Sequence, residues 1–208
     1  MGRLLAIPLL ASAVITLTAA MALRAAEATL AVAAVAVVAI LLTWYAQLHS
    51  GEEQSGADLA SPAAAVTLAV VGRRPWSTLL PVIAAHVIGG VLGGLLALSL
   101  EDRLGDTLIF PNPSLTLAAV GAALVGLVGA WATLSIDAGG SEGLAAVPAV
   151  VAGAVLPLGL VVAFQPAALI GLATAGLVPW DVTLVAAAST VIASVVGAYA
   201  VSLLVPTE

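Results

Sequence analysis

Ser61-Pro62-Ala63-Ala64-Ala65 and Gln165-Pro166-Ala167-Ala168-Leu169 are two copies of one short motif, 104 positions apart (166 minus 62). Two further stretches, Pro75-Trp76 and Val87-Ile88-Gly89-Gly90-Val91, recur at the same offset as Pro179-Trp180 and Val191-Ile192-Ala193-Ser194-Val195. Three matches at one offset, without a gap, predict a duplicated chain with repeats at residues 1–104 and 105–208. A Pro-Ala step in each half of an apolar chain is typical of transporters and channels built from two repeats.

The composition indicates an integral membrane protein. Of the 208 residues, 62% are hydrophobic and 8% charged, whereas soluble domains have about 25% charged residues. The chain has no cysteine and two well-separated histidines, so we expect neither a disulfide nor a protein metal site, and no cofactor. No catalytic constellation is recognisable, so we expect no enzyme. The net charge of −6 argues against binding of nucleic acid or of an anionic lipid patch.

Six stretches reach the roughly 20 apolar residues that a membrane span requires. They are Leu4–Leu23, Ala28–Leu48, Leu79–Leu100, Leu115–Ile136, Leu144–Phe164 and Val182–Val205. Two further apolar pieces, Pro62–Val71 and Pro166–Val178, are too short to cross a hydrocarbon core of about 30 Å. Because each begins with proline, which suits the first position of a helix, and is apolar all round, we expect two re-entrant half-helices.

Each repeat then contains three spans and one half-helix. Three is an odd number, so the second repeat enters the membrane upside down, and the half-helices meet N-terminus to N-terminus near the midplane. With the N-terminus in the cytoplasm, Arg3, Arg73 and Arg74 lie inside and Arg24 and Arg103 outside, which the positive-inside rule favours. The first apolar stretch is long enough to be a span rather than a signal peptide. We expect a protein of a prokaryotic plasma membrane, with the lipid bilayer as its first partner.

A family resemblance covers essentially the whole chain. Residues 55–63, with 66–69 and Gly72-Arg73-Arg74-Pro75, resemble the first signature loop of the aquaporin and glycerol-facilitator (major intrinsic protein) family, S-G-A-H-x-N-P-A followed by G-R-x-P. The stretch from Ala85 to Gly94 is similar to A-Q-x-x-G-A-x-x-G-A, and residues 165–171 resemble N-P-A-R-x-x-G. The resemblance implies an all-α, aquaporin-like fold of six transmembrane helices plus two re-entrant half-helices, with a pore in each monomer and packing as a homotetramer.

The chain departs from the family at its chemical positions. The two signature Asn residues align with Ser61 and Gln165, and the filter Arg with Ala168. The first-loop His aligns with Asp58, and the Gln of the third span with His86. Ser61 remains a good helix N-cap, whereas the Gln165 side chain is too long to cap well. The positive ends of the half-helices still oppose cations, but without the Arg we expect a wider and less polar mouth.

The resemblance and the repeat together predict which residues form the constriction. They are Ser61, Pro62, Ala63, Gln165, Pro166, Ala167, Ala168 and His86. His86 has two interpretations, a titratable group beside the pore or, as we favour, a neutral histidine bonded to a backbone carbonyl of the half-helix. Likewise Glu52, Glu53 and Asp58 are either a vestibule that attracts cations or, as we favour, a solvated loop.

Two functions of different class remain. The first is a membrane channel with a degenerate selectivity filter, which passes small neutral solutes, or water, passively. The alternative is a non-conducting structural or accessory subunit of a larger membrane complex, which would come with other membrane subunits instead of forming a homotetramer.

Overall fold

The computed structural model describes residues 2–24, 28–49, 56–100 and 113–204, and the regular structure in this part of the chain is all helical. The elements are α1 (Gly2–Arg24), α2 (Ala28–His49), α3 (Ala57–Ala60), α4 (Pro62–Val70), α5 (Trp76–Ser99), α7 (Leu115–Asp137), η1 (Glu142–Ala145), α8 (Ala146–Val155), η2 (Leu158–Leu160), α9 (Pro166–Thr174) and α10 (Trp180–Leu204). Five of these, α1, α2, α5, α7 and α10, are long and apolar enough to cross a membrane. The expected all-helical class is confirmed, with helices compatible with a membrane protein.

The predicted span Leu144–Phe164 is the exception, and it requires a correction. Helix α8 ends at Val155, and the apolar helical stretch Glu142–Val155 falls below the length of the five long helices. Leu156 adopts an extended backbone, φ −119° and ψ 152°, because the ring of the following Pro157 disfavours the helical conformation for the residue before it. From there to Gln165 the chain is a non-α-helical, largely buried segment with the short 3-10 helix η2 and a turn over residues 161–164.

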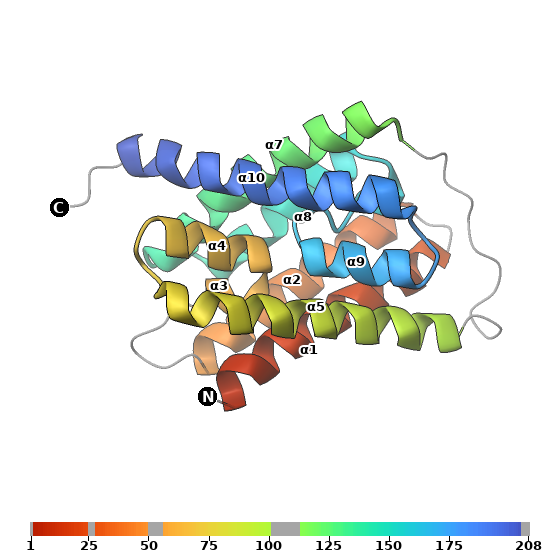
Figure 1. Cartoon of the computed structure of the whole chain (residues 1–208), viewed down its shortest axis with the longest axis horizontal. Helices are drawn as coiled ribbons and strands as arrows, with labels where there is room; N and C mark the ends of the chain where they lie inside the picture. Colours follow the sequence, from red (N-terminus) through yellow and green to blue (C-terminus); the bar gives the residue numbers. More distant parts are fainter. Residues whose placement is uncertain (1, 25–27, 50–55, 101–112, 205–208) are drawn as a thin grey trace.

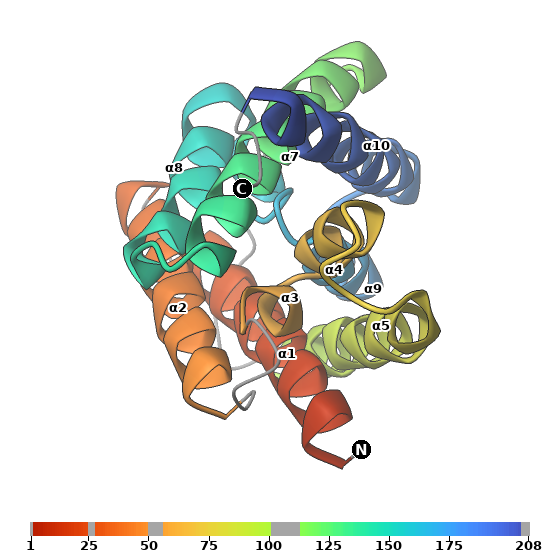
Figure 2. The same cartoon turned by 90° about the vertical axis from the view of Figure 1, so that its left-hand side faces the viewer.

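Helices α4 and α9 occupy the centre of the molecule. Figure 1 shows that they start near each other and run toward opposite ends, between α5 and α10. Seen along the bundle, in Figure 2, the pair lies between α5 and α10, with α1, α2, α7 and α8 on its other side. Each central helix packs against the long helix of the other half of the chain, α4 against α10 and α9 against α5.

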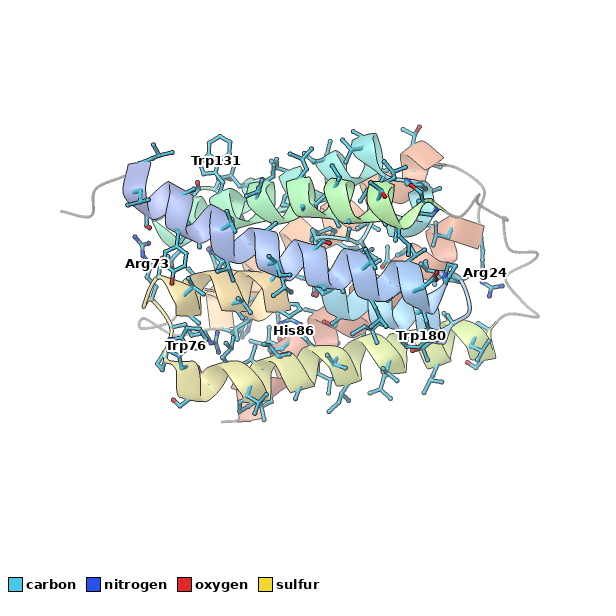
Figure 3. All side chains as sticks on the ribbon, turned by 45° about the horizontal axis from the view of Figure 1, so that its top comes forward. Arg24, Arg73, Trp76, His86, Trp131 and Trp180 are labelled. Carbon is cyan, nitrogen blue, oxygen red and sulfur yellow. The ribbon has the colours of Figure 1, made fainter. Side chains whose placement is uncertain are left out.

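The 104-residue offset of the sequence extends to the helix bounds and to the turns that follow. Helices α4 and α9 both have nine residues and a proline at the first position. Each is followed by a glycine with positive φ, Gly72 at 76° and Gly176 at 72°, before the next long helix begins at Trp76 or Trp180. Figure 3 places these two tryptophans at opposite ends of the molecule. The repeat boundary at residue 104 lies outside the described residues and stays a prediction.

A double row of glycines allows α5 to lie in backbone contact with two neighbours at once. A Cβ atom added at Gly89 or Gly93 would overlap the backbone of α1. One added at Gly90 or Gly94 would overlap the backbone of α9. This is the close approach that small residues permit between apolar helices. It fixes α9, and with it the residues before α9, against α5.

Candidate functional site

The N-termini of α4 and α9 are tied to each other by two reciprocal hydrogen bonds. The hydroxyl of Ser61, the N-cap of α4, accepts a bond from Ala63 N at 3.2 Å and donates one to the carbonyl oxygen of Phe164 at 3.0 Å. The Gln165 amide Nε2 donates to the carbonyl oxygen of Ala60 at 2.8 Å. As predicted from side-chain length, Ser61 caps its own helix and the Gln165 side chain does not. The Gln165 side chain instead crosses to the other half of the chain.

A second set of polar contacts extends from Gln165 toward α5. Its Nε2 also donates to Ser12 Oγ of α1 at 3.3 Å, and Ser12 Oγ lies 2.7 Å from His86 Nδ1 of α5. Ser12, His86 and Gln165 are all fully buried. Figure 3 shows His86 midway between the two ends of the molecule. The partner of His86 is therefore a serine hydroxyl and not the backbone carbonyl that the favoured interpretation expected.

A narrow cavity of about 50 Å³ leads to this junction from one side. Because one water needs about 10–15 Å³ of such a cavity, it can hold a few water-sized molecules. It extends from Ile136 and Ala145, at the end of the molecule where α7 finishes, to Ser61 and Phe164 at the centre. Its other lining residues are Ile15, Ala39, Thr43, Ala57, Ala60, Ala63, Ala64, Val125, Gly126, Gly129, Ala132, Thr133, Pro148, Thr190 and Ser194.

The cavity lining is apolar with a few hydroxyls, several of which already donate elsewhere. Ser61 donates to Phe164, Thr190 donates to the Ala163 carbonyl at 2.9 Å, and Ser194 donates to the Thr190 carbonyl at 2.8 Å. These three hydroxyls therefore offer a molecule in the cavity only acceptor lone pairs. No Asp, Glu, Lys or Arg belongs to the described lining. Such a surface suits small neutral molecules.

On the other side of Phe164 the interior is filled by apolar side chains. The segment from Leu156 to Phe164 is part of a buried hydrophobic cluster with residues of α1, α2 and α9. Among them, Leu23, Val35, Leu160 and Leu172 are at most 1% exposed. Of the described residues from 156 to 164, only Phe164 lines the cavity. Among the described residues, the cavity therefore ends beside Phe164.

The structure separates the predicted constriction residues into two groups. Ser61 and Ala63 line the cavity. The others, Pro62, Gln165, Pro166, Ala167, Ala168 and His86, are buried and are not among its lining residues. Their predicted role as pore residues stays a prediction. Glu52 and Glu53 lie outside the described residues, as does the side chain of Asp58.

Sequence reasoning missed Phe164 and Ser12. Phe164 was the last residue of a predicted span, and only its position directly before Gln165 indicated proximity to the junction. Ser12 lies 153 positions from Gln165, and no signal in the sequence connects the two.

Arg73 and Arg74 lie in the turn between α4 and α5. Arg73 forms an ion pair with Asp137 at the end of α7. Arg74 donates from Nε to Thr78 Oγ1 at 3.1 Å, and burial lowers the pKa of its guanidinium from the usual value. Within the described residues, no group of three or more His, Asp or Glu side chains could hold a metal ion. Comparison with known protein families and with curated proteins finds no match for this chain.

Proposed function

We propose that this protein is an aquaporin-like membrane channel that carries small neutral solutes passively. The observation that carries the proposal is the cavity that leads to the paired N-termini of α4 and α9. Two half-helices of equal length, which start at the centre and run to opposite ends, support an inverted-repeat architecture of this kind. Helix α8 then takes the place of the sixth span in a shortened form.

The solute class follows from charge and from hydrogen-bonding capacity. Each helix N-terminus carries about half a positive charge, and two such ends facing one junction oppose the entry of cations. The described lining has no charged residue, so it gives an ion nothing to replace its hydration shell. Because the Ser61, Thr190 and Ser194 hydroxyls already donate to carbonyls, they offer a solute only hydrogen-bond acceptors, which suits small neutral solutes that carry donor groups.

Transport in this proposal requires the Phe164 side chain to move, because the cavity ends there. With the N-terminus in the cytoplasm, the cavity opens to the cytoplasmic side, since α1 begins at the same end as α7 finishes (Figure 1). The membrane is the plasma membrane of a prokaryote, and the channel assembles as a homotetramer.

Stopped-flow light scattering on proteoliposomes tests the proposal. After shrinkage in a glycerol gradient, vesicles with the purified protein should reswell faster than empty vesicles. A sucrose gradient gives the water permeability separately, and we expect a smaller gain there. Rates equal to those of empty vesicles in both gradients, with folded protein confirmed by circular dichroism, would exclude a channel that is open by default.

The packed segment from Leu156 to Phe164 favours a second candidate, a non-conducting accessory subunit of a larger membrane complex. This segment fills the α9 half of the molecule with apolar side chains, which suits a structural role as well as a closed pore. Purification from native membranes in a mild detergent separates the two candidates. A homotetramer supports the channel, whereas a stoichiometric partner of different sequence supports the accessory subunit.

A further inference from the structure

The buried His86 imidazole is connected to the junction of the half-helices through one hydroxyl group. His86 Nδ1 contacts Ser12 Oγ at 2.7 Å, and Ser12 Oγ receives a bond from Gln165 Nε2 at 3.3 Å. The same Nε2 donates to the Ala60 carbonyl at 2.8 Å. The three side chains come from α1, from α5 and from the residue before α9, so the contacts join three parts of the chain at the centre.

The direction of each proton in this network can be deduced. A side-chain amide nitrogen only donates, and Gln165 Nε2 gives its two protons to Ala60 O and Ser12 Oγ. Ser12 Oγ therefore accepts from Gln165, and among the described residues His86 Nδ1 is its one other hydrogen-bond partner. The hydroxyl proton of Ser12 then points to Nδ1, which acts as an acceptor. The ring proton of a neutral His86 is left on Nε2, which has no partner among the described residues.

We infer that His86 and Ser12 are positioning residues that hold the Gln165 amide in its bond to Ala60. The Ser12 hydroxyl fixed by His86 presents a lone pair to Gln165, and this second acceptor orients the amide plane. Without it, the Gln165 side chain has a single tie to Ala60 and can rotate about that bond. The positioning role itself does not depend on the proposed function. Its consequence, that the fixed amide keeps the junction closed to solutes, rests on the proposed channel.

The equivalent position of the second half supports this assignment. Thr190 lies 104 positions after His86, is also buried, and donates to the Ala163 carbonyl, two residues before Gln165. At this position α5 and α10 each carry a buried polar side chain. The two side chains hold the segment before α9 by hydrogen bonds, one from α5 and one from α10. Thr190 does so directly, and His86 does so through Ser12.

Nitrogen NMR of ¹⁵N-histidine-labelled protein in lipid nanodiscs tests the proton assignment. The chain has two histidines, and the exposed His49 is the internal control because its Nδ1 lies 2.8 Å from the Tyr45 carbonyl and must donate to it. At about pH 8.5, two units above the ordinary imidazole pKa of about 6.5, the expected pattern is a proton on Nδ1 for His49 and on Nε2 for His86. A His49→Gln variant assigns the signals. Ser12→Ala should shift the His86 Nδ1 signal toward that of an unbonded nitrogen.

The positioning role is tested on the Gln165 side chain itself. His86→Leu should remove the protection of the Gln165 amide protons against exchange with solvent deuterium, measured by NMR. His86→Asn, whose carbonyl oxygen can accept from Ser12 near the Nδ1 position, should restore it. A proton on His86 Nδ1, an unchanged spectrum in Ser12→Ala, or equal protection in all variants would overturn the inference. These signals do not depend on transport, so a wild-type protein that fails to conduct would leave this test intact.

Discussion

Ser61 and Gln165 each donate a hydrogen bond to the carbonyl of the residue that precedes the other, Ser61 to Phe164 at 3.0 Å and Gln165 to Ala60 at 2.8 Å. The two residues occupy equivalent positions of the repeated motif, so the pair of bonds is nearly symmetric although the side chains differ. Each bond joins one half of the chain to the other at the point where α4 and α9 begin.

Removal of the Ser61 hydroxyl should destabilise the protein. Ser61→Ala loses the N-cap of α4, which costs about 1 kcal/mol, and leaves the buried Phe164 carbonyl without its donor, a further cost of about 1–3 kcal/mol. Equilibrium unfolding in mixed micelles measures the change. Ser99→Ala is the matched control, because Ser99 is exposed and its hydroxyl donates to the Leu96 carbonyl of its own helix. A loss for Ser61→Ala no larger than for Ser99→Ala would contradict the structure.

The glycine contact between α5 and α9 should not tolerate a methyl group. In Gly94→Ala the new Cβ would overlap the Gly171 carbonyl oxygen, and overpacking of this kind costs about 1–3 kcal/mol or more. Gly129→Ala on α7 is the control, since its nearest neighbour is Pro148 Cγ at 3.9 Å. There the gain in helix propensity, up to about 1 kcal/mol, should dominate. Thermal melting in detergent compares the two variants, and equal melting temperatures would refute the close contact.

The turns after α4 and α9 should respond alike to substitution. Gly72 and Gly176 both have positive φ and open space around the Cβ position, so alanine at either site introduces only backbone strain. We expect Gly72→Ala and Gly176→Ala to lower stability by about 1–2 kcal/mol each, and the corresponding Asn variants by less. Unfolding curves of the four variants test this. A large cost at one site and none at the other would show that the two turns are not equivalent.

A smaller side chain at position 164 should raise permeability if the proposed channel is correct. Phe164→Leu shortens the group at which the cavity ends, and Phe164→Ala removes it. The alanine variant also loses about 3–5 kcal/mol of stability, so the leucine variant is the safer one to interpret. Glycerol flux in proteoliposomes should rise from wild type to leucine to alanine. Val178→Ala, in the same buried cluster but outside the cavity lining, controls for general loosening.

The ion pair between Arg73 and Asp137 should contribute little to stability. The Arg73 side chain is 38% exposed, and exposed pairs contribute at most about 1 kcal/mol, less at high salt. A double-mutant cycle with Arg73→Gln and Asp137→Asn measures the coupling at low and high ionic strength. A coupling well above that value, or one insensitive to salt, would mean that the pair is more deeply shielded than its exposure indicates.

The repeat allowed much of the helical arrangement to be predicted from the sequence. The prolines at 62 and 166 marked the starts of α4 and α9, because proline fixes φ and needs no hydrogen-bond donor at a first helical position. Hydropathy located the five long helices. Hydropathy wrongly extended a span through residues 156–164, because a buried segment has apolar side chains whether or not its backbone is helical. Pro157 and Gly159 were the available signals of a break.

The candidate site was less predictable because it depends on contacts between distant residues. Positions 12, 86 and 165 come together only when α1, α5 and α9 pack against one another. The glycines of α5 allow this packing, but in the sequence they predict only that some helix approaches closely, not which one. The cavity and its end at Phe164 depend on side-chain packing, which a pattern of apolar residues does not specify.

The exchange of partners between the halves has a consequence for biosynthesis. Helix α4 rests on α10 and the glycine row of α5 rests on α9, so the N-terminal half cannot complete its packing while the rest of the chain is still on the ribosome. Domains that fold as they emerge avoid this delay. Here α5 must wait for residues synthesised about seventy positions later (166 minus 94), with its close-contact surface meanwhile open to lipid or to the insertion machinery.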